Sequence, residues 1–335
     1  RQMCIRDSIW IDPKDPNRMI ATNDGGTAVT LTGGKTWSGF SNQSGAQMYR
    51  VDTDDQFPYG VYGNTQDLIV YRVPSASRWG GIPLHMTDFI GSGETARAIP
   101  KPGDPNIVYS LATGATFGGA TMFTVNNIET GQAETRPIWP EILFGTPASE
   151  FKYRFNWQAP FLVSPHDTNT IYMAGNVVFR TRDEGMTWDV ISPDLTHNMT
   201  DKMKVAGSTW LPEYFGQEIF STIHRLEESP HEKGVLWAGS DDGRVHITRN
   251  GGDSWEEVTP PGLPELSAIY EIEISPHDPA TVYLAITRYR KADDYKPYLL
   301  KTADYGKTWK RIDASFPQDE ITRTIREDIE RKGML

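Results

Sequence analysis

The octapeptide TRDEGMTW, residues 181–188, recurs as TADYGKTW at residues 302–309. Two degenerate copies, TLTGGKTW and TRNGGDSW, keep the Gly and the Trp but carry Thr32 or Asn250 in place of the Asp. An Asp in this position accepts hydrogen bonds from the amides of a tight turn, and the Gly supplies a positive φ. Acid chemistry would not survive these replacements, so we interpret the octapeptide as a structural turn between two strands. The residues assigned to this role are Asp183, Gly185, Trp188, Asp304, Gly306, Trp309, Trp255 and Trp37.

The octapeptide closes a longer repeated unit. Each unit begins with a short strand, a Pro-Asp turn and a second strand, as in EIEISPHDPATVYLAI at residues 271–286 and FLVSPHDTNTIYMAG at residues 161–175. A Gly-containing turn and a third strand then lead to the octapeptide, and a fourth strand opens on its Trp. This order predicts a four-stranded antiparallel meander. The units are expected at residues 9–44, 47–75, 98–139, 159–192, 220–259 and 268–313, with a partial unit at 321–335.

A sheet that repeats in this way predicts an all-β fold, a β-propeller of about six four-stranded blades and a truncated seventh. A β-sandwich is the main alternative, but it has no reason to repeat one sequence plan. Residues 1–8, RQMCIRDS, fit none of the repeated patterns, and we treat them as a non-native leader. Residues 9–335 are then a single propeller fragment.

Composition excludes several classes of function. The 33 basic and 44 acidic residues give a net charge of -11, which argues against a nucleic-acid partner. The sole cysteine, Cys4, excludes an intrachain disulfide and a Cys-rich zinc site. No apolar run is long enough to span a bilayer. Because His166, His231 and His277 share one position in the Pro-Asp turn, we expect a turn role for them, no metal site and no cofactor.

The octapeptide resembles the Asp-box, or BNR repeat, of sialidases, sortilin-type receptors and xyloglucanases. The order of the units and stretches such as FPYGVYGNTQD, FKYRFNWQAPFLVSPHD and DYKPYLLKTADYGKTW are most similar to bacterial sortilin-like, xyloglucanase-like propeller proteins, often labelled glycosyl hydrolases. The resemblance covers most of residues 9–335. It implies an extracytoplasmic protein with a glycan or peptide ligand, although no signal peptide is visible in this fragment.

The topology of a meander predicts where a ligand would bind. The Pro-Asp turns and the octapeptides must lie at one end of the propeller, because they join strands one to two and three to four. The turns between strands two and three lie at the other end, where variable loops converge. Functional residues on propellers usually come from such loops on a rigid scaffold.

Carboxylates in these loops are the catalytic candidates, namely Asp24, Asp242, Asp67 and Glu94. Inverting glycoside hydrolysis needs an acid and a base roughly 6.5 to 9.5 Å apart. TNDGG, around Asp24, resembles the xyloglucanase segment that holds a catalytic aspartate, which would make Asp24 the acid or the base. The segment departs from that pattern at Asn23 and Gly25, and a simple turn is the alternative.

Two long linkers, residues 140–158 and 192–218, are rich in aromatic side chains. Exposed aromatic rings beside Arg or Asp stack on sugars or anchor peptides. The alternative is that these rings close the core beneath the loops. The ligand-binding candidates are Tyr153, Arg154, Trp157, Trp210 and Tyr214.

Two functions are compatible with these features. The favoured hypothesis is a sortilin-like module that binds a glycan or a peptide, because no pair of carboxylates stands out. The alternative is a xyloglucanase-like hydrolase that uses two carboxylates. A sialidase is disfavoured, since the sequence lacks an early Arg-Ile-Pro segment and shows no clear set of three arginines. The oligomeric state is left open.

Overall fold

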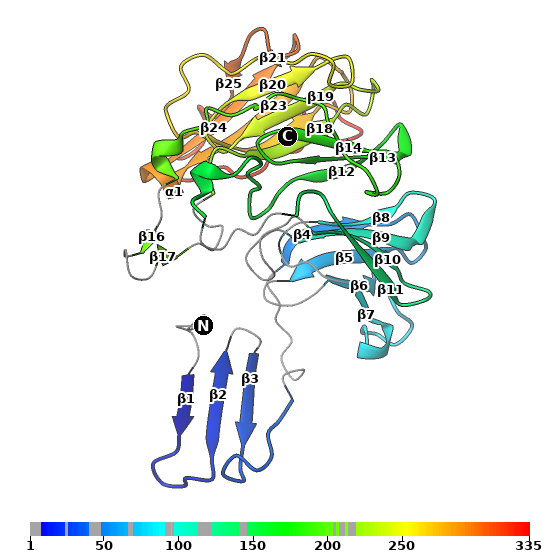
Figure 1. Ribbon diagram of the computed structural model, residues 1–335, viewed down its shortest axis with the longest axis vertical. Coiled ribbons are helices and arrows are strands. Elements are labelled where there is room, and N and C mark those ends of the chain that lie inside the picture. Colours follow the sequence, from blue (N-terminus) through cyan, green and yellow to red (C-terminus); the bar gives the residue numbers. More distant parts are fainter. Residues whose placement is uncertain are drawn as a thin grey trace.

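The computed structural model describes residues 8–23, 26–39, 48–65, 70–90, 95, 97–112, 122–140, 146–203, 206–207, 212–213 and 219–335. Almost all regular structure in these ranges is β-strand (Figure 1). The exceptions are the short helix α1, Tyr289–Ala292, and the 3-10 turns η2, Leu84–Met86, η4, Ala148–Glu150, and η5, Thr200–Lys202.

The strands form consecutive antiparallel meanders, and their repetition makes the fold a β-propeller, as the sequence predicts. Within every four-stranded sheet, each strand pairs with the next one along the chain. A three-stranded sheet, β1–β3, comprises Ser8–Ile11, Met19–Asn23 and Gly26–Thr30, and a two-stranded sheet joins β16, Ala206–Gly207, to β17, Pro212–Glu213. The four-stranded sheets are β4–β7 (Met48–Thr53, Gly60–Thr65, Val70–Pro74, Asp88–Ile90), β8–β11 (Ala98–Lys101, Asp104–Ala112, Met122–Asn127, Gln132–Pro137), β12–β15 (Phe161–Ser164, Asp167–Ala174, Val178–Thr181, Asp189–Val190), β18–β21 (Ile223–Glu228, Leu236–Ser240, Val245–Thr248, Glu256–Glu257) and β22–β25 (Ala268–Ile274, Val282–Arg288, Asp294–Thr302, Lys310–Arg311).

The hydrophobic core lies between successive sheets. The first strands of neighbouring sheets contact one another in the order β4, β8, β12, β18 and β22. Trp237 on β19 and Ile269 on β22 are fully buried in the cluster between the last two sheets. The second strands β19 and β23 are buried along most of their length because neighbouring parts of the chain cover both faces of their sheets. This packing explains why strands such as β19 and β23 lack the alternation of polar and apolar residues that a half-exposed strand shows.

The octapeptide at residues 181–188 is a hydrogen-bonded turn between β14 and β15. Oδ1 of Asp183 accepts a bond from the Thr187 amide at 2.9 Å, and Oδ2 accepts one from the Thr187 hydroxyl at 2.6 Å. The Thr181 hydroxyl accepts a bond from the Gly185 amide at 2.9 Å. Gly185 has a φ of 87°, and a Cβ there would lie 2.7 Å from Cδ1 of Phe123 in the preceding sheet. The turn therefore needs glycine for its conformation and for its packing.

The degenerate copies keep the same pattern of bonds. Oδ1 of Asn250 accepts from the Ser254 amide at 3.0 Å, and its Nδ2 donates to the Ser254 hydroxyl at 2.9 Å. The Thr32 hydroxyl accepts from the Thr36 amide at 2.9 Å. An amide and a hydroxyl thus take the place that the Asp183 carboxylate has in the intact copy, which supports a structural role for the octapeptide.

The octapeptide tryptophans connect neighbouring sheets. The rings of Trp309 and Trp237 pack edge to face with centroids 6.3 Å apart, and Nε1 of Trp309 donates to the Val258 carbonyl at 2.8 Å. Nε1 of Trp255 donates to the Ile191 carbonyl at 2.8 Å. In both copies the donor and acceptor belong to successive sheets, so the indole joins two repeats.

The other two tryptophans differ from each other. Trp188 packs edge to face on Phe123, with centroids 5.5 Å apart. Trp37 stays 42% exposed, and its Nε1 donates to the Gly34 carbonyl of its own turn at 3.1 Å. The packing of the indole therefore differs between the two octapeptides: Trp188 packs on a residue of the preceding sheet, whereas Trp37 bonds within its own turn.

The histidines of the Pro-Asp turns also join successive repeats. Each imidazole donates through Nε2 to a backbone carbonyl of the next repeat along the chain. The pairs are His166 with Ser229 at 2.8 Å, His231 with Ser275 at 2.9 Å and His277 with Asp328 at 2.8 Å. The turn position predicted from the sequence thus has a defined bonding role.

Residues 321–335 repeat the contacts that open a unit. The Glu228 carboxylate accepts from the Gly234 amide at 2.8 Å, and the Glu327 carboxylate accepts from the Gly333 amide at 2.6 Å. In both cases the glycine follows six residues after the glutamate. The segment therefore repeats the bond that closes the turn after β18, although no strand is assigned within it.

Candidate functional site

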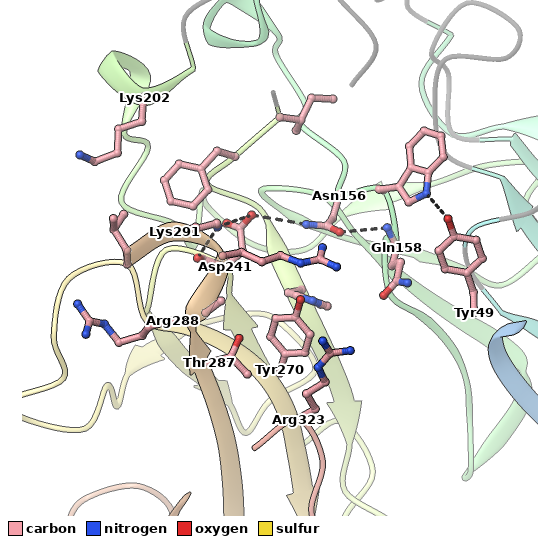
Figure 2. A pocket seen from close by; sticks show the side chains of 17 residues that line it. Tyr49, Asn156, Gln158, Lys202, Asp241, Tyr270, Thr287, Arg288, Lys291 and Arg323 are labelled. Atoms are coloured by element: carbon pink, nitrogen blue, oxygen red, sulfur yellow. Dashed lines mark hydrogen bonds and ion pairs between the residues drawn. The ribbon is translucent and has the colours of Figure 1, made fainter. Parts of the chain in front are cut away.

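A cavity of about 820 Å³ lies at the end of the propeller where second and third strands are joined (Figure 2). The octapeptide turns lie at the opposite end, because they join third strands to fourth strands. The walls combine aromatic, amide, hydroxyl and cationic side chains. They are Tyr49, Asn156, Trp157, Gln158, Lys202, Ile219, Phe220, His224, Asp241, Leu266, Ala268, Tyr270, Thr287, Arg288, Arg290, Lys291 and Arg323.

Three wall residues sit at the same irregularity in three first strands. The pairing register shifts at Tyr49 on β4, at His224 on β18 and at Tyr270 on β22. A β-bulge of this kind leaves one residue out of the ladder and re-aims its side chain. All three bulged side chains line the cavity. The same β-bulge, repeated in three first strands, therefore supplies three side chains of the cavity wall.

Arg323 occupies the same repeat position without belonging to a strand. It precedes Asp328, whose carbonyl accepts the bond from His277, by five residues. His224 precedes Ser229 by the same number. Tyr270 and Ser275 have this spacing as well, so the repeat register identifies Arg323 as the fourth member of the set.

Asp241, in the turn between β19 and β20, is the carboxylate of the cavity wall. It is 4% exposed, and its Oδ1 accepts from the Thr222 amide at 2.9 Å. Its Oδ2 lies 3.2 Å from the Thr222 hydroxyl and 3.5 Å from Nδ2 of Asn156. Burial raises the pKa of Asp241 to about 6, although the nearby Lys291 opposes this rise. The group thus changes charge near neutral pH.

Lys291 projects from α1 towards Asp241 (Figure 2). Its Nζ donates to the Asp241 carbonyl at 2.9 Å and lies 3.5 Å from Oδ2 of that residue. The ammonium group also lies 3.7 Å from the centre of the Phe220 ring, in a cation-π arrangement. Burial lowers the pKa of Lys291, against the opposing charge of Asp241.

His224 is held neutral in the wall. Burial, followed by the charge of Arg225, lowers the pKa of His224 well below its ordinary value. Its ring lies 4.6 Å from the ring of Tyr270, and its Nδ1 is buried with no hydrogen-bond partner among the described residues. The imidazole therefore serves the cavity as an aromatic, uncharged surface.

Charged residues near the bulges form ion pairs. Arg225 contacts Glu271 at 2.6 Å, and Arg326 reaches the same carboxylate at 3.2 Å. Arg97 pairs with Asp52. The pairs on Glu271 join β22 to β18 and to the segment that carries Arg323, and the Asp52 pair joins β4 to the residue before β8, so the wall residues are held in register.

Of the four predicted catalytic residues, Asp242 is the one that lies within the described part of the chain. Asp242 does not line the cavity. Its Oδ1 accepts from the Ser240 hydroxyl at 2.5 Å, its Oδ2 accepts from the His197 amide at 2.8 Å, and the residue is 2% exposed. The neighbouring Asp241 takes the place we expected for Asp242, because those bonds turn Asp242 into its own loop. The other candidates, Asp24, Asp67 and Glu94, lie outside the described residues.

Of the three described linker candidates, one lines the cavity and two are packed inside the fold. Trp157 lines the cavity, and its Nε1 donates to the Tyr49 hydroxyl at 3.2 Å. Tyr153 instead packs on Phe179 with ring centroids 5.0 Å apart. Arg154 is 4% exposed and bonds inside the fold rather than to the cavity. Its partners are the Ser221 carbonyl, Asp194 and Thr196.

The remaining two linker candidates, Trp210 and Tyr214, lie outside the described residues. Sequence reasoning missed Tyr49, His224, Tyr270 and Arg323, for which an alignment of the repeats at the first strand was the available signal. It also found no set of three arginines, whereas the folded chain places Arg288, Arg290 and Arg323 on one cavity.

Within the described ranges, every helix is too short or too polar to cross a membrane. The same part of the chain contains no group of three or more His, Cys, Asp or Glu side chains placed to hold a metal ion.

No protein-family profile and no curated protein matches the sequence. Among solved structures, the chain is similar to an ancestral GH74 enzyme, with a TM-score of 0.51 and 14% identity over 92% of this chain and 38% of that one. It is also similar to the extracellular domain of a B. thetaiotaomicron protein assigned as a one component system, with a TM-score of 0.50 and 10% identity over 96% of this chain and 35% of that one. The chain therefore spans little more than a third of either structure, and the likeness concerns the propeller fold.

Proposed function

We propose that this β-propeller binds a glycan in the cavity lined by the bulged first-strand residues. The observation that carries the proposal is the repeated bulge, which aims Tyr49, His224 and Tyr270 into one space. A bulge interrupts the pairing of its strand, so its recurrence at a cavity indicates a dedicated surface. The volume of about 820 Å³ falls within the roughly 300 to 1,000 Å³ typical of ligand pockets.

The chemistry of the walls supports a sugar. Aromatic rings such as Tyr270 and Trp157 offer flat apolar faces to the CH groups of a pyranose. Gln158 and Thr287 supply donors and acceptors beside them, which suit hydroxyl groups that both donate and accept. The rings can thus contact the CH groups of a sugar while the amides bond to its hydroxyl groups.

We place the protein outside the cytoplasm, as a sortilin-like or xyloglucanase-like propeller with Asp-box turns of the BNR type. The bonds around Asp183 and Asn250 support the Asp-box assignment. The fold shared with an extracellular domain from B. thetaiotaomicron supports the location.

A glycoside hydrolase is the second candidate, and Asp241 is the observation that favours it. Burial raises the pKa of this carboxyl to about 6, which suits a general acid near neutral pH. It is the one carboxylate among the described wall residues, and a two-carboxylate mechanism would need a second. Release of reducing ends from a bound polysaccharide, lost in Asp241→Asn, would support this second reading.

The test is a binding screen of the full chain against panels of soluble oligosaccharides and of peptides. Tyr270→Ala and Gln158→Ala remove a ring and an amide from the cavity, and Met186→Ala changes an exposed side chain in an octapeptide turn at the other end. We expect a sugar ligand whose affinity falls at least about tenfold in both cavity variants and stays constant in the control. Failure of every oligosaccharide to bind, or binding that neither cavity variant weakens, would refute the proposal. A peptide that binds in place of the sugars would refute it as well.

A further inference from the structure

The cavity wall is cationic in a chain that is acidic overall. It carries five Lys or Arg side chains and one carboxylate, Asp241, whereas the chain has a net charge of -11. Three of the cations have a carboxylate partner. These pairs are Arg288 with Asp294, Lys202 with Glu265 at 3.5 Å and Lys291 with Asp241 at 3.5 Å.

Arg290 and Arg323 are the two that remain. Nε of Arg290 and NH2 of Arg323 each lie 2.8 Å from the Tyr289 hydroxyl. Their guanidinium groups lie 5.5 and 5.2 Å from the centre of the Tyr289 ring. Neither forms an ion pair within the part of the chain that the structure describes. Two positive charges are thus held around one neutral ring.

Both arginines are exposed, so a ligand in the cavity can reach them. The two like charges share one neutral hydrogen-bond acceptor, and a bound anion would attract both of them. A planar guanidinium has five donors, and a bond to one tyrosine hydroxyl leaves most of them available for a ligand. A carboxylate suits this fork because it accepts two parallel N–H bonds from one guanidinium.

We infer that the cavity binds an acidic glycan, with a sugar carboxylate held between Arg290 and Arg323. The inference rests on the proposed function and adds the class of sugar. Arg323 and Tyr270 occupy the same repeat position and lie together in the wall (Figure 2). A uronate ring stacked on Tyr270 would therefore present its carboxylate near Arg323, while its hydroxyl groups face the amides of Asn156 and Gln158.

A uronate polymer fits better than an acidic peptide. The described wall offers rings, amides and hydroxyls as side chains, and these suit a molecule that carries hydroxyl groups on every residue. Arg290 and Arg323 supply the two wall cations that have no carboxylate partner among the described residues. A ring with one carboxylate and several hydroxyls uses both parts of the wall at once.

The experiment titrates the full chain with a short oligogalacturonate and with the same oligosaccharide after its carboxyl groups have been reduced to neutral alcohols. The test variant is Arg290→Gln with Arg323→Gln, which keeps side-chain amide donors but removes both charges. The matched control is Arg182→Gln, an exposed arginine in an octapeptide turn at the other end of the propeller. An acidic peptide of equal charge forms a further arm.

We expect the oligogalacturonate to bind at least about tenfold more tightly than its reduced form, and the double variant to lose that preference while Arg182→Gln keeps it. Equal binding of both oligosaccharides, weakened by Tyr270→Ala, would overturn the acidic-glycan inference and leave the proposed function intact. Absence of binding by either sugar, together with a negative screen, would remove the proposed function itself. An acidic peptide that binds as tightly as the oligogalacturonate would also overturn the inference.

Discussion

The ammonium group of Lys291 lies 2.9 Å from the backbone carbonyl of Asp241 and 3.5 Å from its carboxylate. The contact joins the turn after β19 to the helix after β23, so two neighbouring repeats meet at the cavity through one cation and one anion. The polar side chains of Thr222 and Asn156 also lie beside the Asp241 carboxylate, and the negative charge of Asp242 acts on it as well. Its charge state therefore sets the balance of charge on the wall.

The first prediction concerns the pH dependence of acidic-glycan binding. Because burial raises the pKa of Asp241 to about 6, the carboxyl is neutral below that pH and ionised above it. Its protonation removes a negative charge from the cavity and frees Lys291 for the ligand, whose uronate groups stay ionised. We expect affinity to rise several-fold between about pH 7.5 and about pH 5, measured by calorimetric titration.

The control for this prediction is Asp241→Asn, which is neutral throughout the range. Its affinity should match that of the unchanged chain at the lower pH and vary little with pH. An equally steep pH dependence in Asp241→Asn would show that another group is responsible.

The second prediction concerns stability in acid. Hydrogen bonds from the Thr187 hydroxyl and amide lower the pKa of Asp183 to about 2, below the ordinary value of 3.8. A carboxyl with a depressed pKa in the folded state stabilises the fold above its unfolded-state pKa and loses that contribution as pH falls through its folded-state pKa. The free energy of unfolding should therefore fall steeply between about pH 4 and about pH 2, and Asp183→Asn should fall less steeply.

Asn250 already shows that an asparagine fits this turn. Asp183→Asn should thus change stability little near neutral pH, where urea unfolding provides the measurement. Asp253→Asn, at an exposed position, is the control and should keep the slope of the unchanged chain. Identical acid profiles for Asp183→Asn and the unchanged chain would contradict the assigned role of the carboxylate.

The parts of the fold that depend on local sequence could be predicted. The octapeptide needs only its own eight residues to form its bonds, and each sheet is a meander of strands that are adjacent in the chain. Local turn chemistry and strand order therefore follow from residue types. The end of the propeller where the cavity lies follows from the same topology.

The wall of the cavity depends on contacts that the repeat pattern hides. A bulge at His224 or Tyr270 shifts one side chain out of the regular alternation, so a period of two places it on the wrong face. Asp241 and Asp242 are adjacent in one turn, and the amide of His197, from a distant linker, decides which of them faces the cavity. Which of two adjacent residues faces the cavity is therefore decided by a hydrogen bond to a residue far away in the sequence.

The third prediction separates backbone strain from packing in the octapeptide. Gly185 and Gly103 have almost the same φ, 87° and 85°, but a Cβ at Gly185 would lie 2.7 Å from Phe123 while one at Gly103 meets nothing within 4 Å. Gly103→Ala should cost about 1 to 2 kcal/mol for its conformation. Gly185→Ala should cost about 1 to 3 kcal/mol more, because Phe123 must move.

Urea unfolding of both variants under the same conditions provides this comparison. Equal losses would mean that the sheet carrying Phe123 adjusts freely to the added methyl group. The packing role of the octapeptide against the preceding sheet would then be wrong, whereas its role as a turn would stand.

The fourth prediction concerns the histidine bonds between repeats. Nε2 of His231 donates to the Ser275 carbonyl at 2.9 Å, and the His277 imidazole makes the equivalent bond to Asp328. Each substitution by Ala should lower the free energy of unfolding by about 1 kcal/mol, since it removes one hydrogen bond across a repeat interface. Because the two imidazoles donate to different carbonyls, those of Ser275 and Asp328, the double variant should lose about the sum.

His85→Ala, at an exposed histidine in the 3-10 turn η2, is the matched control and should leave stability within about 0.5 kcal/mol. The two interface variants should differ in one further respect. Since His277 contacts the segment at 321–335, its loss should speed proteolytic cleavage there, while His231→Ala should leave that rate unchanged. If cleavage accelerates equally in both variants, the cause is a loss of global stability. The prediction that the His277 bond to Asp328 holds residues 321–335 locally would then be wrong.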